Sequence, residues 1–134
     1  MRRTCLNWPM DRRRNPFVAL SLLAVLAVFS GCTRPTYDLP KLRAIKAEAA
    51  LLAASHPIKL PQDGVIIPKD QWPPAIASLK PEFVIVEPWG VDITIKPYFD
   101  GGWGYEIPRN KRYLPMPATC YSEPGPGVFW HGPC

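Results

Sequence analysis

The sequence predicts a small α+β domain. We expect a three-stranded antiparallel meander with an N-terminal amphipathic helix and a short second helix, followed by a proline-rich C-terminal segment. Three observations predict this class. Apolar residues recur at helical spacing after Asp38, three short runs within residues 83–107 are typical of strands, and prolines interrupt the chain from residue 109 onward.

The first helix is expected to begin after Asp38, which can act as its N-cap, and Pro40 is tolerated in a first turn. It should end at Ser55-His56-Pro57, and its early part is basic, which indicates a solvated face or one attracted to anionic headgroups. A shorter helix is expected over residues 72–79, capped by Asp70 and stopped by Pro81. The apolar face of the first helix comprises Leu42, Ile45, Ala49 and Leu52.

The strands are expected at residues 83–86, 91–96 and 103–107, and the second of them alternates strictly between apolar and polar side chains. Between the first two, Pro88-Trp89-Gly90 fits a three-residue hairpin loop with Gly90 in the left-handed conformation.

The strand register follows from parity, because a slip of one residue inverts a face of the sheet. Pairing Glu87 with Val91, and Pro97 with Trp103, places the large odd-numbered side chains on one face, against which the helices can pack. Val84 and Val86 would then lie on the opposite face. We expect the apolar cluster Val128-Phe129-Trp130 to cover them.

The N-terminal region contains an uncharged run, Phe17 to Gly31, preceded by Arg12-Arg13-Arg14. Fifteen residues are too few for a transmembrane helix, which needs about 20, but they suit the apolar core of an export signal. The start of translation is open between Met1 and Met10, because the second gives a compact basic segment. Either start leaves the mature chain unchanged.

The run ends in Phe29-Ser30-Gly31-Cys32, which resembles the lipobox of bacterial lipoproteins: an apolar residue, two small residues and a cysteine. The resemblance covers the first 32 residues only. It implies that the Cys32 thiol accepts a diacylglyceryl group and that the signal peptidase cleaves before this residue. Ordinary signal cleavage near Ser30 and an uncleaved anchor are the alternatives. The expected organisation is a signal peptide at residues 1–31, a lipidated tether at 32–38 and one domain at 39–134.

Two cysteines, Cys120 and Cys134, remain after Cys32. Export places the chain in an oxidising compartment, where such a pair is expected to form a disulfide. The rival interpretation is a metal site of Cys120, His131 and Cys134, but it lacks an evident fourth ligand.

Charge and motifs argue against several functional classes. Beyond Cys32 the chain has 11 basic and 10 acidic residues, which offers no electrostatic support for a nucleic-acid partner.

Residues 101–104 are glycine-rich but open no helix, so they predict a loop and no phosphate site. Ser55 adjoins His56, and neighbours on a helix do not face each other, which predicts no nucleophile–base pair. Asp92 and Glu106 could share the outward face, where solvated carboxylates are common. We therefore expect no enzyme, no cofactor and no resident metal.

The aromatic side chains are the one feature that could bind a partner. Trp72, Trp103 and Tyr105 are expected in the core, whereas Trp89 at a hairpin tip is the best surface candidate. The sequence thus predicts a lipid-anchored protein of the cell envelope, on the periplasmic face of the outer membrane in a Gram-negative host. Two functions remain open: an adaptor or structural component that binds another envelope protein, and a module that binds cell-wall glycan through exposed aromatics.

Overall fold

In the computed structural model, residues 33–59, 63–99 and 101–134 are described, and residues 33–134 form a compact unit with its own core. The lipobox and Cys32 lie outside the described residues. Within the described part of the chain, no helix has the length and apolarity needed to cross a bilayer.

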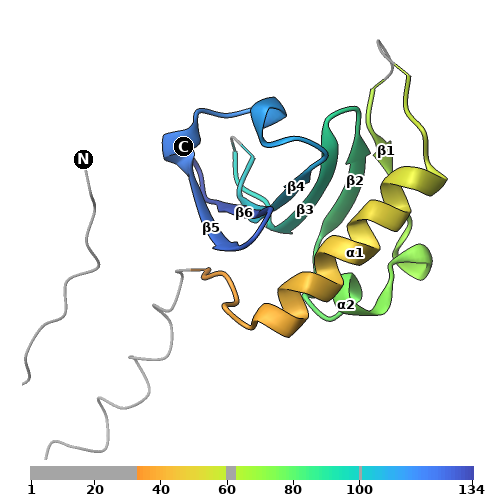
Figure 1. Ribbon diagram of the computed structural model, residues 1–134, viewed down its shortest axis with the longest axis horizontal. Helices are drawn as coiled ribbons and strands as arrows, with labels where there is room; N and C mark the ends of the chain where they lie inside the picture. The colour runs from red at the N-terminus through yellow and green to blue at the C-terminus, as the bar shows by residue number, and fades with distance from the viewer. Residues whose placement is uncertain (1–32, 60–62, 100) are drawn as a thin grey trace, which may run out of the picture. The chain divides into compact units, whose positions relative to one another are not determined.

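The sheet is six-stranded and antiparallel, with the order β1-β2-β3-β4-β6-β5, and one long helix packs against it (Figure 1). The expected three-stranded meander is therefore wrong: β2, β3 and β4 are its central strands, but three more strands extend it on both sides. The strands are β1 Val65–Ile66, β2 Phe83–Glu87, β3 Gly90–Lys96, β4 Trp103–Pro108, β5 Tyr121–Gly125 and β6 Val128–His131.

Helix α1, Leu39–Ser55, confirms the expected first helix. Asp38 is its N-cap, and the side-chain Oδ1 accepts a hydrogen bond from the backbone N–H of Lys41 at 3.2 Å. The four apolar residues expected on one face, Leu42, Ile45, Ala49 and Leu52, are all buried.

The second helix is shorter than expected. Helix α2, Pro74–Ala77, is a single turn capped by Pro73, and Asp70 lies earlier, in the 3-10 helix η2, Lys69–Gln71. A residue that precedes a proline is disfavoured in helical geometry, and both Trp72 and Pro73 are extended, so the helix begins only at Pro74. Two further 3-10 helices, η3 at Lys111–Tyr113 and η4 at Ala118–Cys120, lie in the connection between β4 and β5.

The register of the β2–β3 hairpin differs by one residue from the expected pairing. Glu87 pairs with Gly90 and Val86 with Val91, so the loop has only two residues, Pro88 and Trp89. Gly90 lies within β3 and has no positive φ. A Cβ there would collide with the carbonyl oxygen of Ile107, so this position needs a glycine for space and not for a left-handed turn.

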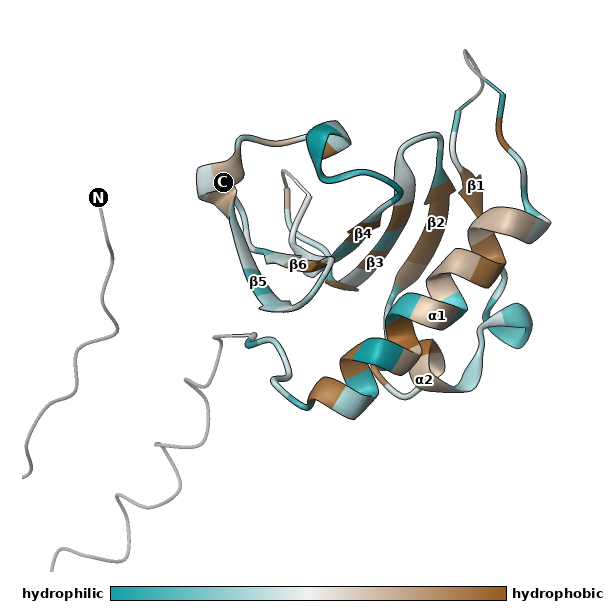
Figure 2. Ribbon diagram, viewed as in Figure 1, coloured by the Kyte–Doolittle hydropathy of each residue, from teal (hydrophilic) through white to brown (hydrophobic). Residues whose placement is uncertain are grey.

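The one-residue difference inverts both faces of β2. Val84 and Val86, expected on the far face, are fully buried in the core, whereas Phe83 is 43% exposed on the other side. Between β3 and β4 the actual pairs, Val91 with Ile107 and Ile93 with Tyr105, differ by two residues from those expected, so the same side chains still face the core. In Figure 2 the hydrophobic segments, drawn brown, lie along α1 and the central strands.

The cluster Val128-Phe129-Trp130 does not cover β2 either. It forms most of β6, which pairs with β4 and carries Val128 and Trp130 into the same core. The ring of Trp130 packs edge-on against that of Tyr105, with centroids 4.8 Å apart. The Tyr105 hydroxyl in turn accepts a hydrogen bond of 2.7 Å from the backbone N–H of Thr36, which attaches the segment before α1 to the sheet.

Candidate functional site

The hairpin tip carries an aromatic hollow of about 480 Å³, lined by Pro88, Trp89, Tyr113 and Leu114. Trp89, expected to be exposed, is half-buried here, and Tyr113 is 63% exposed. Two hydrogen bonds position the segments that carry these rings. The N–H of Arg109 donates to the carbonyl of Trp89 at 2.9 Å, and the Asn110 side chain caps η3 by accepting from the N–H of Arg112. The sequence predicted the Trp89 contribution but not that of Tyr113 and Leu114, because nothing in a proline-rich stretch shows that it folds back onto the hairpin.

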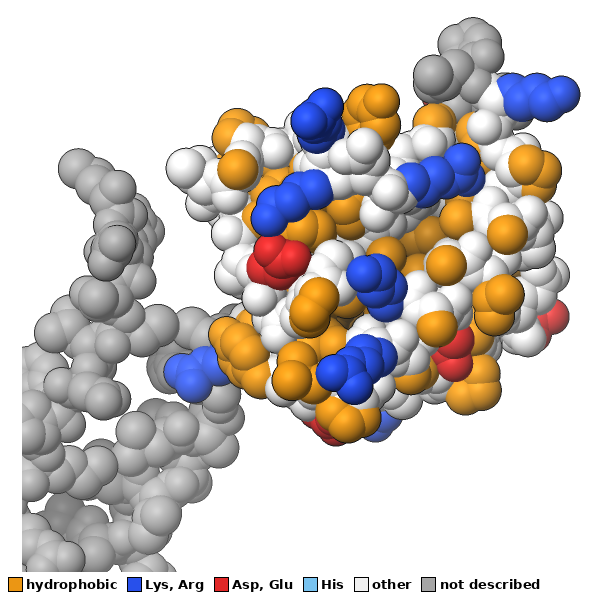
Figure 3. Space-filling model, viewed as in Figure 1, with side chains coloured by type: hydrophobic (Ala, Val, Ile, Leu, Met, Phe, Trp, Pro, Cys, Tyr) orange, Lys and Arg blue, Asp and Glu red, His pale blue; other side chains and the backbone are white. Residues whose placement is uncertain are grey.

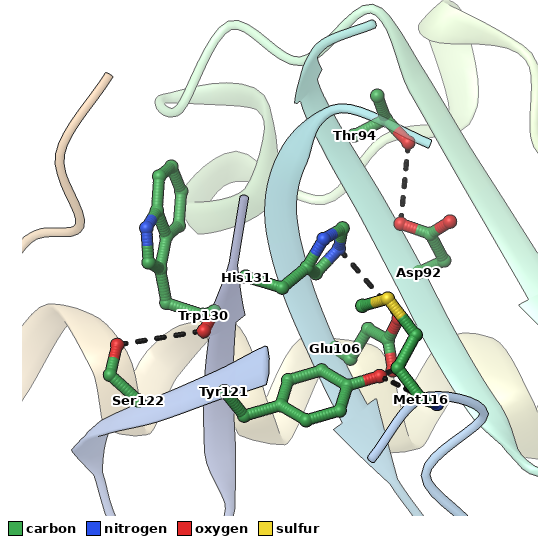
Figure 4. Close-up of polar contacts among 8 residues, drawn as sticks. All are labelled: Asp92, Thr94, Glu106, Met116, Tyr121, Ser122, Trp130 and His131. Atoms are coloured by element: carbon green, nitrogen blue, oxygen red, sulfur yellow. Dashed lines mark hydrogen bonds and ion pairs between the residues drawn. The ribbon is translucent and has the colours of Figure 1, made fainter. Parts of the chain in front are cut away.

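A second group of polar residues lies on the face of the sheet that α1 does not cover (Figure 4). At its centre is Glu106 of β4, which is only 4% exposed. Its Oε2 accepts a hydrogen bond of 2.7 Å from the hydroxyl of Tyr121, and its Oε1 lies 3.7 Å from Nε2 of His131. Asp92 is opposite Glu106 on the neighbouring strand and accepts a 3.3 Å bond from Thr94.

Burial dominates the electrostatics of this cluster. The pKa of Glu106 is raised to about 7, chiefly by burial. The hydrogen bond from Tyr121 opposes this shift, and the negative charges of Asp92 and Glu87 add to it. Burial likewise raises the pKa of Asp92 to about 6, against the hydrogen bond from Thr94. The pKa of His131 is lowered, again by burial, although bonds to backbone groups of Gly132 and Gly102 act in the opposite direction.

Perturbed carboxyl groups can mark an active site, but low exposure also raises the pKa of carboxyl groups that only support the fold. Glu106 is 4% exposed and offers little surface to a ligand. His131 Nε2 is buried without a hydrogen-bond partner among the described residues, and 3.7 Å is too long for one to Glu106. Glu106, Tyr121 and His131 come from β4, β5 and β6 in this order. The sequence did not predict that these three side chains meet, because neither β5 nor β6 was expected as a strand.

The predicted separation of Ser55 and His56 is wrong, but no catalytic pair results. Ser55 Oγ lies 3.1 Å from His56 Nδ1, because His56 is the C-cap of α1 and has left helical geometry. His56 Nδ1 also lies 3.1 Å from the carbonyl oxygen of Leu52, and Ser55 Oγ lies 3.0 Å from the same oxygen. A carbonyl only accepts, so a bond from His56 requires its proton on Nδ1, where it cannot act as a base for Ser55. Both side chains instead serve the open carbonyls at the helix end.

Cys120 and Cys134 lie at disulfide distance, with their Sγ atoms 2.03 Å apart and their Cα atoms 5.8 Å apart. The pairing joins the end of η4 to the residues after β6. Within the described residues, no group of three or more histidine, cysteine or acidic side chains is arranged to hold a metal ion. The alternative site of Cys120, His131 and Cys134 therefore has no geometric support.

Comparison with known proteins identified no matching family model, no matching curated protein and no matching solved structure. The chemistry of the two groups of residues is thus the basis for any functional assignment.

Proposed function

We propose that this protein is a lipid-anchored component of the cell envelope, attached through Cys32, whose domain binds another envelope protein without catalysis. The aromatic hollow at the hairpin tip carries this proposal. Its lining residues are apolar or aromatic, and no carboxylate is among them. Apolar side chains and proline-rich segments of a partner dock well in such hollows.

A cell-wall glycan is the less suitable occupant. Sugars stack on aromatic rings, but their hydroxyl groups also need hydrogen-bond partners once they are removed from water. The only polar side-chain groups among the four lining residues are the hydroxyl of Tyr113 and the indole N–H of Trp89. The hollow therefore favours the adaptor over the glycan-binding module.

Site-specific photo-crosslinking of the full-length protein in its host tests the binding surface. A photoreactive residue in place of Tyr113 should give a discrete protein adduct, and Trp89→Ala in the same chain should abolish it. Tyr98 is a matched control, because it is a similarly exposed aromatic, at 61%, that follows the opposite end of β3. An equal adduct from position 98, or an adduct at 113 that survives Trp89→Ala, would contradict the proposal.

The lipid attachment has its own test. Cys32→Ser removes the thiol that would accept the diacylglyceryl group, so metabolic labelling with a fatty acid should mark the parent protein and not the variant. The variant should persist as an unprocessed precursor of higher mass. Labelling of the Cys32→Ser chain would show that the lipobox assignment is wrong.

A further inference from the structure

The outer face of α1 combines exposed apolar side chains with cations. We define it as six exposed residues of α1: Leu39, Arg43, Lys46, Ala47, Ala50 and Leu51. Leu39 is 46% exposed and Leu51 is 69% exposed, so both add apolar surface to the same helix that carries the cations. Figure 3 looks onto this helix and shows basic and apolar side chains next to each other over it.

The charged side chains of this face, Arg43 and Lys46, are both basic. The only acidic residue within α1, Glu48, faces the opposite flank, where its two carboxylate oxygens accept bonds from the backbone N–H groups of Ala75 and Ile76 at 3.0 and 2.9 Å. Arg43 and Lys46 therefore have no carboxylate from their own helix beside them. Lys46 donates to the carbonyl of Pro126 at 3.0 Å. It also interacts electrostatically with the carboxylate of Glu123, which is itself paired with Lys111.

The hollow beside this face has the same character. It measures about 380 Å³ and lies between α1 and the β5–β6 turn, with Leu42 and Val128 as part of its apolar lining and Arg43 and Lys46 at its sides. An occupant would have to be apolar in part and negatively charged in part. That combination describes the interface of an anionic bilayer, where acyl chains and phosphate groups lie within a few ångströms of each other.

The position of the attachment point favours a membrane as this occupant. The Thr36 N–H is bonded to Tyr105, so only four residue steps separate the fixed part of the domain from Cys32, a reach of about 14 Å. The chain enters α1 directly after this point, through Tyr37, which is 71% exposed, and Leu39. A lipid on Cys32 would therefore bring the N-terminal end of this face close to the headgroups.

We infer that the outer face of α1 lies on the anionic leaflet to which the protein is anchored. The inference rests on the proposed lipid attachment for its orientation, but the affinity of the face itself does not require the lipid. Tyr37, Leu39 and Leu51 insert at the headgroup boundary, and Arg43 and Lys46 contact phosphate groups. The contact would add to the anchorage that the two acyl chains of a diacylglyceryl group on Cys32 provide.

Vesicle co-sedimentation of residues 33–134 tests this contact, since these residues form a compact unit with their own core. The unlipidated domain should sediment with phosphatidylcholine vesicles that contain phosphatidylglycerol and much less with vesicles of phosphatidylcholine alone. Each cation near an anionic surface contributes about fivefold to partitioning, so Arg43→Gln with Lys46→Gln should lower it roughly 25-fold. Added salt should weaken it as well.

The matched control removes the same charge elsewhere. Lys69→Gln with Lys80→Asn takes away two exposed cations from the segment around α2, on the flank that Glu48 faces, and should leave partitioning nearly unchanged. Arg43→Lys should retain most of the binding. Equal losses in both double variants, equal binding to both vesicle types or no binding at all would overturn the inference. A dimer in solution that is lost on Arg43→Gln with Lys46→Gln would assign the face to a second copy and would also overturn it.

The two proposals fail separately. Because the vesicle assay uses a chain without Cys32, a failure of lipidation shows only in the fatty-acid labelling and leaves the partitioning unaffected. Conversely, fatty-acid labelling of the full-length protein, together with no binding of the isolated domain to anionic vesicles, would support the lipid anchor and contradict the membrane contact of α1.

Discussion

Asp92 and Glu106 lie directly opposite each other on β3 and β4, on the face of the sheet away from α1. Both carboxyl groups are largely withdrawn from water, and the negative charge of Asp92 adds to the pKa shift of Glu106. The raised pKa values, about 6 for Asp92 and about 7 for Glu106, follow from this arrangement. The cluster therefore makes the stability of the domain depend on pH in a predictable direction.

Glu106→Gln should remove much of that dependence. The folded state binds the Glu106 proton more tightly than the unfolded chain, whose pKa is near 4.5, so its stabilising contribution is complete at low pH and is lost as the pH rises toward about 7. At about pH 8 the variant should be more stable than the parent by about 3 kcal/mol, whereas at about pH 4 the two should agree. The amide oxygen can still accept the Tyr121 hydroxyl.

Urea titration at several pH values measures this effect. Glu82→Gln, which removes an exposed carboxylate just before β2, is the control and should change little. His131 contributes with the opposite sign, because its lowered pKa costs stability as the pH falls below about 6.5. An unchanged pH profile in Glu106→Gln would show that the carboxylate is better solvated than its burial indicates.

The sequence predicted α1 and the core face of β3 well, because both have unambiguous periodicity. Four apolar residues at helical spacing and a capping aspartate define α1, and strict alternation defines which side of β3 is buried. The predicted grouping of Ile93 with Tyr105 on the core side is confirmed for the same reason, although the partner assignments were two residues out.

The faces of β2 could not be obtained in this way. Residues 83–86 are Phe-Val-Ile-Val, so every position is apolar, and no alternation distinguishes one register from the next. The register was therefore set by the assumption of a three-residue loop, and this assumption was wrong because the loop has two residues. The space requirement of Gly90 against β4 is a tertiary property that no local pattern shows.

The outer strands and the polar cluster escaped prediction for a different reason. Pro124 lies within β5, and β1 has only two residues, so neither resembles a strand locally. Both are edge strands, where proline and short length are tolerated. Glu106, Tyr121 and His131 meet only because β6 inserts between β4 and β5, so the cluster was as unpredictable as that topology.

Gly90→Ala should destabilise the domain by roughly 1–3 kcal/mol, as overpacking of a tight backbone contact does. A Cβ at this position would meet the carbonyl oxygen of Ile107 and lie 2.7 Å from Cα of Pro108, both of which are backbone atoms. Gly64→Ala is the control, since the three atoms nearest to its Cβ would all belong to the carboxylate end of the flexible Glu87 side chain. Chemical denaturation of the two variants should separate them clearly. Similar stabilities would mean that β3 and β4 can move apart at little cost.

Reduction of the Cys120–Cys134 pair should raise the intact mass by two hydrogens and lower the free energy of unfolding by about 3 kcal/mol, the value of the chain-entropy model for a loop of this size. The protein must be purified from the envelope without reductant. Mass spectrometry before and after reduction and alkylation gives the first result, and urea titration gives the second. Two thiols that alkylate freely in the native protein would contradict the predicted bond.

Trp89→Ala and Trp103→Ala should differ in what they disturb. Trp103 packs against the core, its ring lies 5.7 Å from that of Tyr98, and the ammonium of Lys96 lies 5.3 Å above it. Trp89 is also half-buried, but it lines an open hollow and is not part of the core cluster. Truncation at Trp103 should therefore lower the free energy of unfolding by about 3 kcal/mol, near the lower end for core tryptophans, and truncation at Trp89 by about 1 kcal/mol.

In the crosslinking experiment with the probe at position 113, only Trp89→Ala should abolish the adduct at a temperature where both variants are folded. Equal destabilisation by the two changes would place Trp89 in the core, because a ring that supports packing to that extent is not available to a partner.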